Sequence, residues 1–387
     1  MVDSASVWWI DTADHLGAWL RQVHDVNRIA VDVESNGMFA YQPDVCTIQF
    51  AWELPDGSTR AAIVDTLAIP LPALSSLLGD PFRLKVIHDL AFDARILNTR
   101  GIVLRSVRDT SVAATYLRKP GSGLASLLAA EFGIQVSKEK QNSDWSQRPL
   151  STESLAYLAD DVYHLLRLDT RLDQQVQQAG IADEVATETA YRLMNALEES
   201  APPSAPHLRT RGAERLGGVQ TRILEAIAAA RETWAMEKNL PPQRLLADKL
   251  LLSMAQHPPR SMANLMRVGL VRKLTEKQRT ELLQAILFAE QDAKDHPEQF
   301  RKPVAPPMLP VAQRIANKNL EKRLQTWRSA EAERRDVHEQ VVLPTHCIRW
   351  LLSRKPTTEE QIASMPGLGK ARAQRYAGRL LSLVTGE

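Results

Sequence analysis

Short runs of apolar and β-branched residues, separated by turn signals, dominate the first quarter of the chain. Residues 28–35 (RIAVDVES), 45–52 (VCTIQFAW) and 60–65 (RAAIVD) predict three successive strands. The segments between them, NGMFAYQPD and ELPDGS, are rich in turn-forming residues. A fourth strand is predicted at residues 85–89 (KVIHD), and a fifth runs into VRDT. The first quarter of the chain therefore predicts a β-sheet.

Helical periodicity alternates with these strands and then replaces them. Helices are predicted at residues 71–79, at residues 92–101 with Gly101 as the closing residue, and around SVAATYLRK. From Leu124 to about residue 199 the pattern is helical throughout. Strands that alternate with helices are typical of a mixed α/β sheet, so the first 200 residues predict an α/β domain.

Two proline-rich stretches divide the rest of the chain. SAPPSAPHLRTRG and HPEQFRKPVAPPMLP predict semi-extended linkers, and the residues after each stretch have a helical pattern. We therefore expect an α/β domain at 1–200, a linker at 201–212, a helical module at 213–292, a linker at 293–310 and a second helical module at 311–387.

The two helical regions resemble each other weakly. Each has a long first helix with a Trp, then a Leu-Pro pair, an apolar helix and a Gly-Leu turn. The matching positions are Trp234 and Trp327, Leu240-Pro241 and Leu343-Pro344, and Gly269-Leu270 and Gly367-Leu368. We interpret them as diverged copies of one small module. The alternative is one larger helical domain with chance similarity.

The charge of the 387-residue chain is unevenly distributed, although the net charge is only +2. Residues 1–200 contain 17 Lys and Arg against 27 Asp and Glu, hence −10, and residues 201–387 contain 31 against 19, hence +12. An acidic first half suits a site that binds metal cations, and a basic second half suits a polyanionic partner. The alternative is two solvated surfaces of opposite sign.

Several classes of protein are disfavoured by composition. No apolar run approaches the roughly 18 residues of a membrane span, so no membrane association is expected. The first residues lack the basic and apolar regions of a secretory signal. Cys46 and Cys347, the two cysteines, are far apart in sequence, which disfavours a disulfide framework or a zinc site. A reducing, cytoplasmic location is expected.

Two carboxylates share one face of the first predicted strand. Asp32 and Glu34 are two residues apart, and residues i and i+2 of a strand point to the same face. Two adjacent unpaired carboxylates in a sheet are costly, and a hard cation such as Mg²⁺ between them removes the conflict. The alternative is an edge strand with a polar outer face.

Further candidate groups lie on two predicted helices. Asp93 lies at the start of the helix predicted at 92–101. The alternative role for an acid at this position is to stabilise the helix through its dipole, and Asp89 is the nearest other candidate for the site. Tyr157 and Asp161 are four residues apart and therefore share a helix face. A phenol one turn from a carboxylate can hold a water molecule. The alternative for this pair is ordinary packing.

The order of these groups resembles the three motifs of the DEDD exonuclease superfamily, in its tyrosine-containing branch. Other segments are similar to the ribonuclease D family, and ARETWAMEKNLPPQRLLADKLLLSMA resembles the helicase-and-ribonuclease-D C-terminal (HRDC) domain. These other segments are DTSVAATYL, the start of the helix at 123–127, and 138–166. The resemblance implies a ribonuclease H-like α/β exonuclease domain with a mixed central sheet, followed by two small all-α HRDC-type modules.

The same resemblance implies a chemistry and a set of roles. The chain would be a 3′–5′ exoribonuclease that releases 5′-mononucleotides by a two-metal mechanism with Mg²⁺ or Mn²⁺. Asp32 would bridge both metals, Glu34 and Asp161 would complete one, and Asp93 would reach the other. Tyr157 would orient the attacking water. The substrates would be tRNA or other structured RNA precursors.

Residues outside this acidic group are candidates for contact with nucleic acid. Aromatic side chains after the first motif can stack on a base, and the basic residues can bind phosphates. The Gly-x-Gly turn at 367–369 resembles the backbone-binding turn of helix-hairpin-helix proteins. The candidates are Phe39, Tyr41, Arg148, Arg244, Lys249, Lys370, Arg372 and Arg375. The alternatives are loop packing for the aromatic residues, and a helix cap with a solvated basic face for the turn.

Two other functions fit parts of the pattern. One is a DNA-directed 3′–5′ exonuclease of the same superfamily that acts in repair. The other is a non-catalytic RNA-binding protein, which would have no need for five residues that are costly without metal. We expect a monomer whose partner is RNA.

Overall fold

The computed structural model describes residues 7–137, 139–198, 204–269, 271–296, 298 and 310–386. These residues form two compact units. Unit 1 contains the described parts of Met1–Ser35, Val45–Glu198 and Leu309–Glu387, and unit 2 contains those of Asn36–Asp44 and Glu199–Met308. The predicted linkers at 201–212 and 293–310 fall partly outside the described residues.

A six-stranded mixed sheet forms the centre of unit 1, as the sequence predicted. Its strand order is β1-β4-β3-β2-β5-β6. The strands are β1 (Val7–Ile10), β2 (Arg28–Ser35), β3 (Val45–Glu53), β4 (Thr59–Asp65), β5 (Leu84–Ile87) and β6 (Val107–Asp109). Strands β2, β3 and β4 pair antiparallel, whereas β1 with β4, β2 with β5 and β5 with β6 are parallel. Strand β1 was not anticipated from the sequence.

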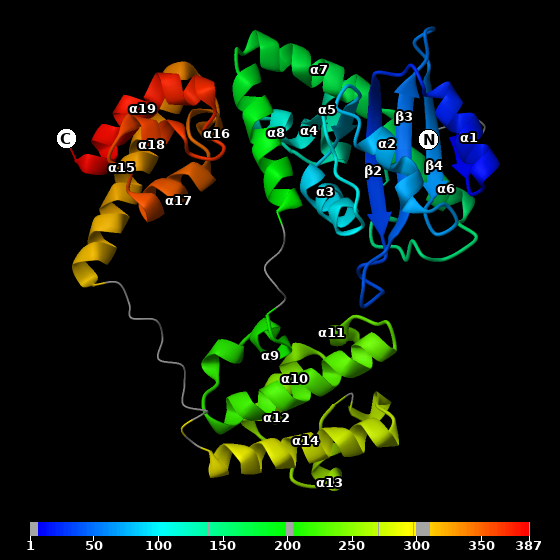
Figure 1. The fold of residues 1–387 in the computed structure, drawn as a ribbon, viewed down its shortest axis with the longest axis vertical. Helices are drawn as coiled ribbons and strands as arrows, with labels where there is room; N and C mark the ends of the chain where they lie inside the picture. The colour runs from blue at the N-terminus through cyan, green and yellow to red at the C-terminus, as the bar shows by residue number, and fades with distance from the viewer. Residues whose placement is uncertain are drawn as a thin grey trace. The chain divides into compact units, whose positions relative to one another are not determined.

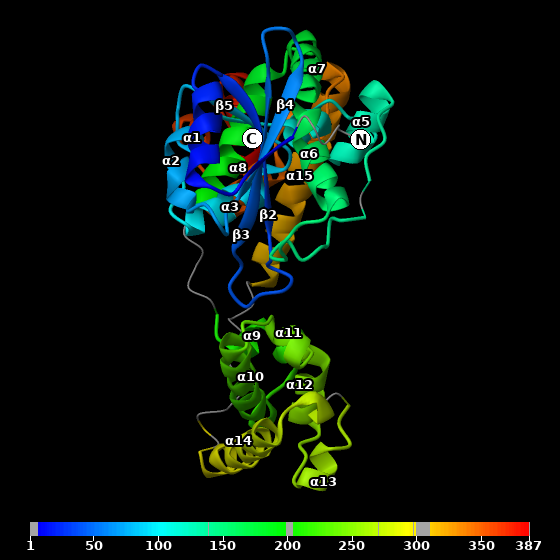
Figure 2. The same ribbon diagram turned by 90° about the vertical axis from the view of Figure 1, so that its right-hand side faces the viewer.

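Helices cover both faces of this sheet (Figures 1 and 2). Helices α1 (Ala13–Gln22), α2 (Ser75–Leu78) and α3 (Leu90–Thr99) lie on one face, with α6 (Thr152–Tyr163) on the other. Helix α7 (Leu165–Gln178) contacts β2, β3 and β5. The side chains of β2 alternate between the two faces of the sheet. Ile29, Val31 and Val33 therefore join the hydrophobic core on one face, and Ala30 joins the core on the other.

Small side chains line the sheet face that carries the candidate carboxylates. Ala30, Ala51 and Ala61 are register partners across β2, β3 and β4, and all three are fully buried. Because an alanine extends little beyond its backbone, helices can approach this face closely. Asp32 and Glu34 follow Ala30 on the same face, so the alternation of β2 directs them toward these helices.

The remaining elements of the α/β region agree only in part with the prediction. Those elements are η2 (Leu71–Leu74), α4 (Thr110–Tyr116), α5 (Leu124–Phe132) and α8 (Ala182–Leu197). The prediction of continuous helix from Leu124 was wrong for the segment between α5 and α6, where the described residues form turns and irregular structure. Gly133 ends α5 in the left-handed conformation, with a φ of 69°.

Unit 2 consists of an all-helical module together with the loop that follows β2. Its helical elements are α9 (Pro206–Arg209), η3 (Ala213–Arg215), α10 (Val219–Glu237), α11 (Pro242–Leu245), α12 (Asp248–Gln256), α13 (Met262–Leu265), η4 (Val271–Lys273) and α14 (Glu276–Asp295). Helices α10, α12 and α14 enclose the core. Thr275 and Gln278 form a capping box that starts α14. The loop 36–44 groups with this module rather than with the sheet.

The second helical module packs within unit 1. Its helices are α15 (Val311–Arg335), α16 (Glu339–Val342), α17 (Thr345–Arg354), α18 (Glu359–Ala363) and α19 (Lys370–Thr385). Its buried residues, including Leu324, Leu351 and Leu380, are continuous with buried residues of α4, α5 and α7. We call residues 310–386 the C-terminal module.

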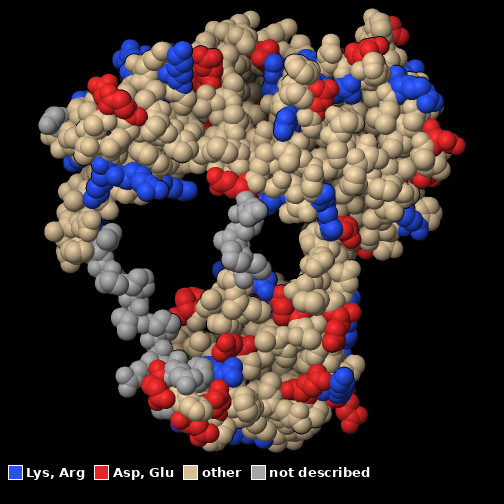
Figure 3. All heavy atoms as spheres, viewed as in Figure 1, with Lys and Arg blue, Asp and Glu red and all other residues tan. Residues whose placement is uncertain are grey.

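Charges of both signs are interspersed on the visible face of the molecule (Figure 3). Many arginines of the basic half are paired with carboxylates, as in Arg231 with Asp248 and Arg260 with Glu290. Both pairs lie within the basic half, so they are already balanced in its net charge of +12. Among the described helices, none is long and apolar enough to cross a membrane.

Candidate active site

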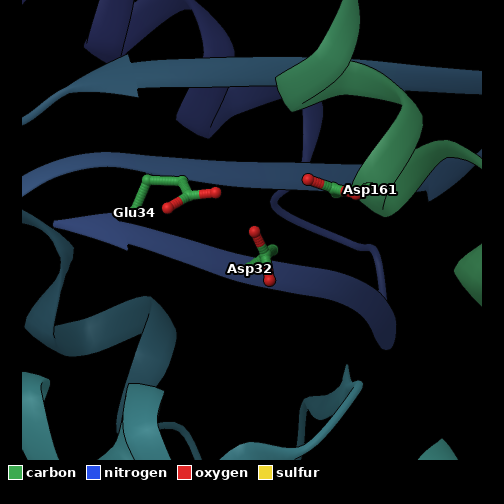
Figure 4. Close-up of side chains that lie close together, drawn as sticks. All are labelled: Asp32, Glu34 and Asp161. Carbon is green, nitrogen blue, oxygen red and sulfur yellow. The ribbon is translucent and has the colours of Figure 1, made fainter. Parts of the chain in front are cut away.

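Three carboxylates converge from a strand and a helix (Figure 4). Asp32 and Glu34 extend from β2, and Asp161 extends toward them from α6. One oxygen from each lies within 4.8 Å of the others, a spacing suitable for a shared metal ion. The paired strand β3 fixes the two strand residues, because Asp32 lies opposite Gln49 and Glu34 opposite Thr47. This arrangement matches the predicted strand and helix positions.

The sequence of α6 determines which way Asp161 points. The Ser151 hydroxyl accepts a hydrogen bond from the Ser154 amide at 3.2 Å and starts the helix. Leu158, Ala159 and Val162 are buried. Tyr157 and Asp161 are one turn apart and both line the cavity described below.

Asp93 is positioned by a buried aspartate that the sequence analysis did not select. The Asp109 carboxylate accepts hydrogen bonds from the backbone amides of Asp89 and Leu90, at 3.0 and 3.2 Å, at the start of α3. It also accepts from the Ser111 amide at 2.8 Å, at the start of α4. Asp109 thus caps two helices. The sequence contained a signal for this capping role, because Asp109 comes just before the helix predicted around SVAATYLRK.

Asp93 lies near the group of three but is not part of it. It is 5% exposed, and its Oδ2 atom has no hydrogen-bond partner among the described residues. Burial raises its pKa well above the usual range, and the charges of Asp32 and Glu34 raise it further. An unpaired buried carboxylate oxygen next to other acids is a costly arrangement that a bound cation would relieve.

The pKa values of the other acids are raised for the same reasons. Burial raises the pKa of Asp32 to about 6. Burial, followed by the charges of Asp32 and Asp161, raises the pKa of Glu34 to about 9. Burial and then the charge of Asp32 raise the pKa of Asp161 to about 8. Full ionisation of this group at neutral pH therefore requires positive charge, and hard oxygen donors suit Mg²⁺ or Mn²⁺.

Tyr157 lies next to these acids against an aromatic neighbour. Its ring stacks on Trp145, which comes from the irregular segment between α5 and α6. Burial raises the pKa of the phenol, and the charges of Asp161 and Glu34 raise it further. Tyr157 therefore keeps its proton at neutral pH and can act as a hydrogen-bond donor.

A polar cavity of about 610 Å³ opens over the acids. Its lining includes Asp32, Glu34, Tyr157 and Asp161. Other polar residues in its lining include His88, Asp89, Ser111, Gln141 and Arg192. Among the charged and aromatic candidates for nucleic-acid contact selected from the sequence, none lines this cavity. His88 interacts with Thr110 at 2.9 Å, and burial lowers its pKa.

Arg148 was predicted to contact a phosphate, and the structure corrects this prediction. Its Nε and one terminal nitrogen donate hydrogen bonds to the two carboxylate oxygens of Asp65, each at 2.7 Å. It also donates to the backbone carbonyls of Cys46 and Trp145. These bonds join the irregular segment before α6 to strands β3 and β4. Arg148 therefore holds the segment that carries Trp145.

Phe39 and Tyr41 also differ from the predicted role of stacking on a terminal base. The Tyr41 hydroxyl donates to Glu232 at 2.7 Å, and its amide donates to Asn239 at 3.1 Å. The guanidinium of Arg244 lies over the Phe39 ring at 4.3 Å. These contacts fall within unit 2, so the loop after β2 is used for packing on the first helical module.

The C-terminal candidates divide between buried and exposed positions. Arg372 is 1% exposed and donates to the carbonyls of Val341 and Leu368, so it is not available to bind a phosphate. Arg375 forms an ion pair with Glu184 at 3.1 Å. Lys370 is exposed, as is Lys249 in the first module.

The Gly-x-Gly turn faces protein rather than solvent, which corrects the comparison with a backbone-binding turn. Gly367 and Gly369 have φ values of 75° and 77°. A Cβ at Gly367 would lie 2.8 Å from the Tyr191 ring, and one at Gly369 would lie 2.8 Å from Thr187 Cγ2. Both neighbours belong to α8, so the glycines allow the C-terminal module to approach this helix closely.

Comparison with known families matches both regions of the chain. Residues 7–177 match the 3′-5′ exonuclease family model, and residues 220–286 and 317–384 each match the HRDC domain model. The second match supports two modules rather than one larger helical domain. A Ribonuclease D from Gluconacetobacter diazotrophicus is 33% identical over 72% of this chain and 71% of its own length. The Ribonuclease D of Escherichia coli is 29% identical over 67% of this chain and 69% of its own length.

A solved structure has the same fold. The crystal structure of Escherichia coli RNase D, described as an exoribonuclease involved in structured RNA processing, superposes with a TM-score of 0.70. The superposition covers 98% of this chain and 99% of that one, at 23% sequence identity. The fold prediction of a ribonuclease H-like exonuclease domain followed by HRDC modules is confirmed.

Proposed function

The chain belongs to the ribonuclease D family of 3′–5′ exoribonucleases, and from that premise we propose that it trims the 3′ ends of structured RNA precursors such as tRNA, with two divalent cations in its acidic site. The family relationship identifies the enzyme class. The convergence of Asp32, Glu34 and Asp161 within 4.8 Å is the observation that supports the metal-dependent mechanism.

The proposed ligand set carries the pattern of the family over to the acids of this site. Asp32 would contact both cations, Glu34 and Asp161 would complete the binding of one, and Asp93 would contact the other. The raised pKa values and the unpaired Asp93 oxygen support this assignment, because both features fit a site whose charge is balanced by cations. Two such cations would supply an activated water and stabilise the leaving oxygen of the phosphodiester. The products would be 5′-mononucleotides.

The protein residues contribute orientation. Tyr157 would hold the attacking water through its phenol, and its stacking on Trp145 limits the directions in which that phenol can point. Asp109 fixes the start of α3 and hence the direction of Asp93. Arg148 fixes the segment that carries Trp145. We propose Asp109 and Arg148 as positioning residues, whereas Tyr157 would contact the attacking water directly.

A groove on the C-terminal module is the surface that we propose for contact with the body of the RNA. It lies between α15 and α19, has a volume of about 600 Å³, and includes Trp327. Lys322, Arg323 and Arg379 line it, and Asp and Glu are absent from its described lining. Lysine and arginine bind phosphates, and an indole can stack on a base.

A substrate panel tests the proposed function. The purified protein is incubated with a 3′-extended tRNA precursor and with DNA of the same sequence, in Mg²⁺ or Mn²⁺ and with Asp32→Asn as the inactive control. We expect metal-dependent, stepwise shortening of the RNA with release of nucleoside 5′-monophosphates. Preferential shortening of the DNA would support the alternative of a DNA-directed exonuclease.

A further inference from the structure

A chain of polar contacts, buried except at Arg192, connects the active-site cavity with the C-terminal module. It begins at Arg192 on α8, whose Nε donates to Glu188 Oε1 at 3.2 Å. The Tyr116 hydroxyl donates to Glu188 Oε2 at 3.2 Å and accepts a hydrogen bond from Arg372 at 3.2 Å. Arg372 belongs to α19, so three contacts span the distance from the cavity to the C-terminal module.

Arg192 occupies an unusual place in the cavity. Among the described residues that line it, Arg192 is the only lysine or arginine, whereas Asp32, Glu34, Asp89 and Asp161 contribute negative charge. Its Nε is directed to Glu188, and its two terminal amino groups make no hydrogen bond to a described residue. A planar guanidinium with both terminal groups available can bind the two oxygens of a phosphodiester.

Glu188 is held more firmly than a helix-surface acid. It is 7% exposed and is an acceptor for Tyr116 in addition to Arg192. His346 of the C-terminal module lies 3.9 Å from the same carboxylate and stacks on Tyr191, with ring centroids 3.7 Å apart. An isolated pair of this spacing on a helix surface would hold Arg192 only weakly. Here the glutamate is fixed by groups from α4 and from the docked module.

The docked module is itself held by buried charges. Arg372 also reaches the backbone carbonyl of Glu184 on α8 at 3.5 Å, and Arg375 and Arg335 lie 3.1 and 3.6 Å from the Glu184 carboxylate. Removal of the module would leave Glu184 without these partners, and it would take His346 from Glu188 and the donor Arg372 from Tyr116. The module therefore supports the position of Glu188, and through it that of Arg192.

We propose that Arg192 binds a phosphodiester of the RNA inside the active-site cavity and that the C-terminal module keeps Arg192 oriented through Glu188 and Tyr116. The inference rests on the proposed exoribonuclease function and assigns one contact to its substrate. Arg192 is a substrate-binding residue, and Tyr116 and Glu188 are positioning residues. The module thus contributes to the cavity without entering it.

Substitution of Arg192 tests the phosphate contact. Arg192→Ala should raise KM for a short single-stranded oligoribonucleotide about ten- to one-hundredfold, because hydrogen bonds between charged groups are lost, with kcat close to that of the wild type. Arg192→Lys should recover part of the loss. Arg171→Ala is the matched control, because Arg171 pairs with Glu131 and does not line the cavity.

A binding measurement gives a second readout that requires no turnover. In the Asp32→Asn background, fluorescence anisotropy with a labelled form of the same oligoribonucleotide should show the same weakening for Arg192→Ala. Wild-type KM and affinity in Arg192→Ala would overturn the phosphate contact. A wild-type protein that shortens no RNA would instead overturn the proposed function.

A double-mutant cycle tests the connection to the module. Tyr116→Phe removes the hydroxyl between Glu188 and Arg372 and leaves the ring in place. We expect a severalfold rise in KM, and we expect Arg192→Ala with Tyr116→Phe to be no worse than Arg192→Ala alone, because both changes act on one contact. Wild-type KM in Tyr116→Phe, or fully additive effects, would overturn the connection. Thermal unfolding of each variant identifies any loss of folding.

Discussion

The rings of Trp145 and Tyr157 stack with their centroids 5.7 Å apart and an angle of 26° between their planes. Trp145 is 1% exposed and comes from an irregular segment, whereas Tyr157 lies on α6. The contact links a loop to the helix that carries Asp161. It gives Tyr157 a fixed neighbour on one side, which an exposed tyrosine on a helix would lack.

Replacement of Trp145 should reduce catalysis more than substrate binding. Trp145→Phe keeps an aromatic neighbour for Tyr157 and should lower kcat only severalfold. Trp145→Ala removes that neighbour, so it should lower kcat further and should also lower the free energy of unfolding by about 3–5 kcal/mol. Steady-state kinetics and urea denaturation measure the two effects. Unchanged kcat in a folded Trp145→Ala protein would show that the stacking does not position the phenol.

Replacement of Asp32 should abolish cleavage without abolishing RNA binding. Asp32→Asn keeps the size of the side chain but removes the charge that we assign to both cations, so kcat should fall by at least about a thousandfold, or roughly 4 kcal/mol of transition-state stabilisation. Product release from labelled RNA and anisotropy in the same buffer measure the two properties. Turnover near the wild-type rate would contradict the metal assignment.

The stability of the metal-free protein should fall as pH rises. The folded pKa values of Asp32, Asp161 and Glu34 are about 6, 8 and 9, all above their ordinary values. A raised folded pKa means that the folded protein binds the protons more tightly, so this contribution is present below about pH 4 and is lost as pH rises through about 6 to 9. Divalent cations should compensate at high pH.

Thermal unfolding with EDTA or with Mn²⁺, at about pH 5 and about pH 8, tests this expectation. The rise in Tm on addition of Mn²⁺ should be larger at the higher pH. The control is the double variant Asp32→Asn, Glu34→Gln, which lacks two of the three groups and should show a much smaller cation effect. An equal rise at both pH values would argue against cation binding by these acids.

Arg148 should matter for stability rather than for direct RNA binding. Loss of one partner from a buried ion pair costs about 3–5 kcal/mol, and we expect about 2 kcal/mol for Arg148→Ala because 24% of this side chain is exposed. Urea denaturation measures the loss, and anisotropy should show an RNA affinity within about twofold of the wild type. A large loss of affinity without loss of stability would restore the sequence-based role in phosphate binding.

Charge reversal in the groove between α15 and α19 should weaken RNA binding in a salt-dependent way. Lys322→Glu and Arg379→Glu should each lower affinity for structured RNA and reduce the slope of log affinity against log salt by about 0.7–0.9, the value for one phosphate contact. Glu321→Lys on α15 is a useful comparison, since Glu321 does not line the groove. Unchanged slopes would exclude the groove as an RNA surface.

Much of the fold could be predicted because it depends on local pattern. The alternation of RIAVDVES predicted both the strand β2 and the shared face of Asp32 and Glu34. The spacing of Tyr157 and Asp161 predicted their shared helix face. Strand β1 escaped prediction because it has only four residues and pairs with β4 alone, a contact between distant parts of the chain.

The candidate nucleic-acid contacts were harder to predict because the availability of a charge depends on its neighbours. Arg148 is paired with Asp65, 83 residues away, and Arg372 is buried against residues of α4, α8 and α16. A sequence shows that an arginine is present and not which carboxylate or carbonyl it meets. Arg192 illustrates the opposite case, since a helix-face arginine was brought to the cavity by packing.

The sequence by itself predicted the enzyme class through its resemblance to the ribonuclease D family, and it placed the candidate acids on shared faces, because strand and helix periodicity assigns each side chain to a face. Only the tertiary structure decided which of those faces meet, with Asp161 beside Asp32, Trp145 on Tyr157 and the C-terminal module on α8. The physical reason is that such contacts depend on the packing of elements far apart in the chain. Burial then changes the pKa of each acid and the availability of each cation.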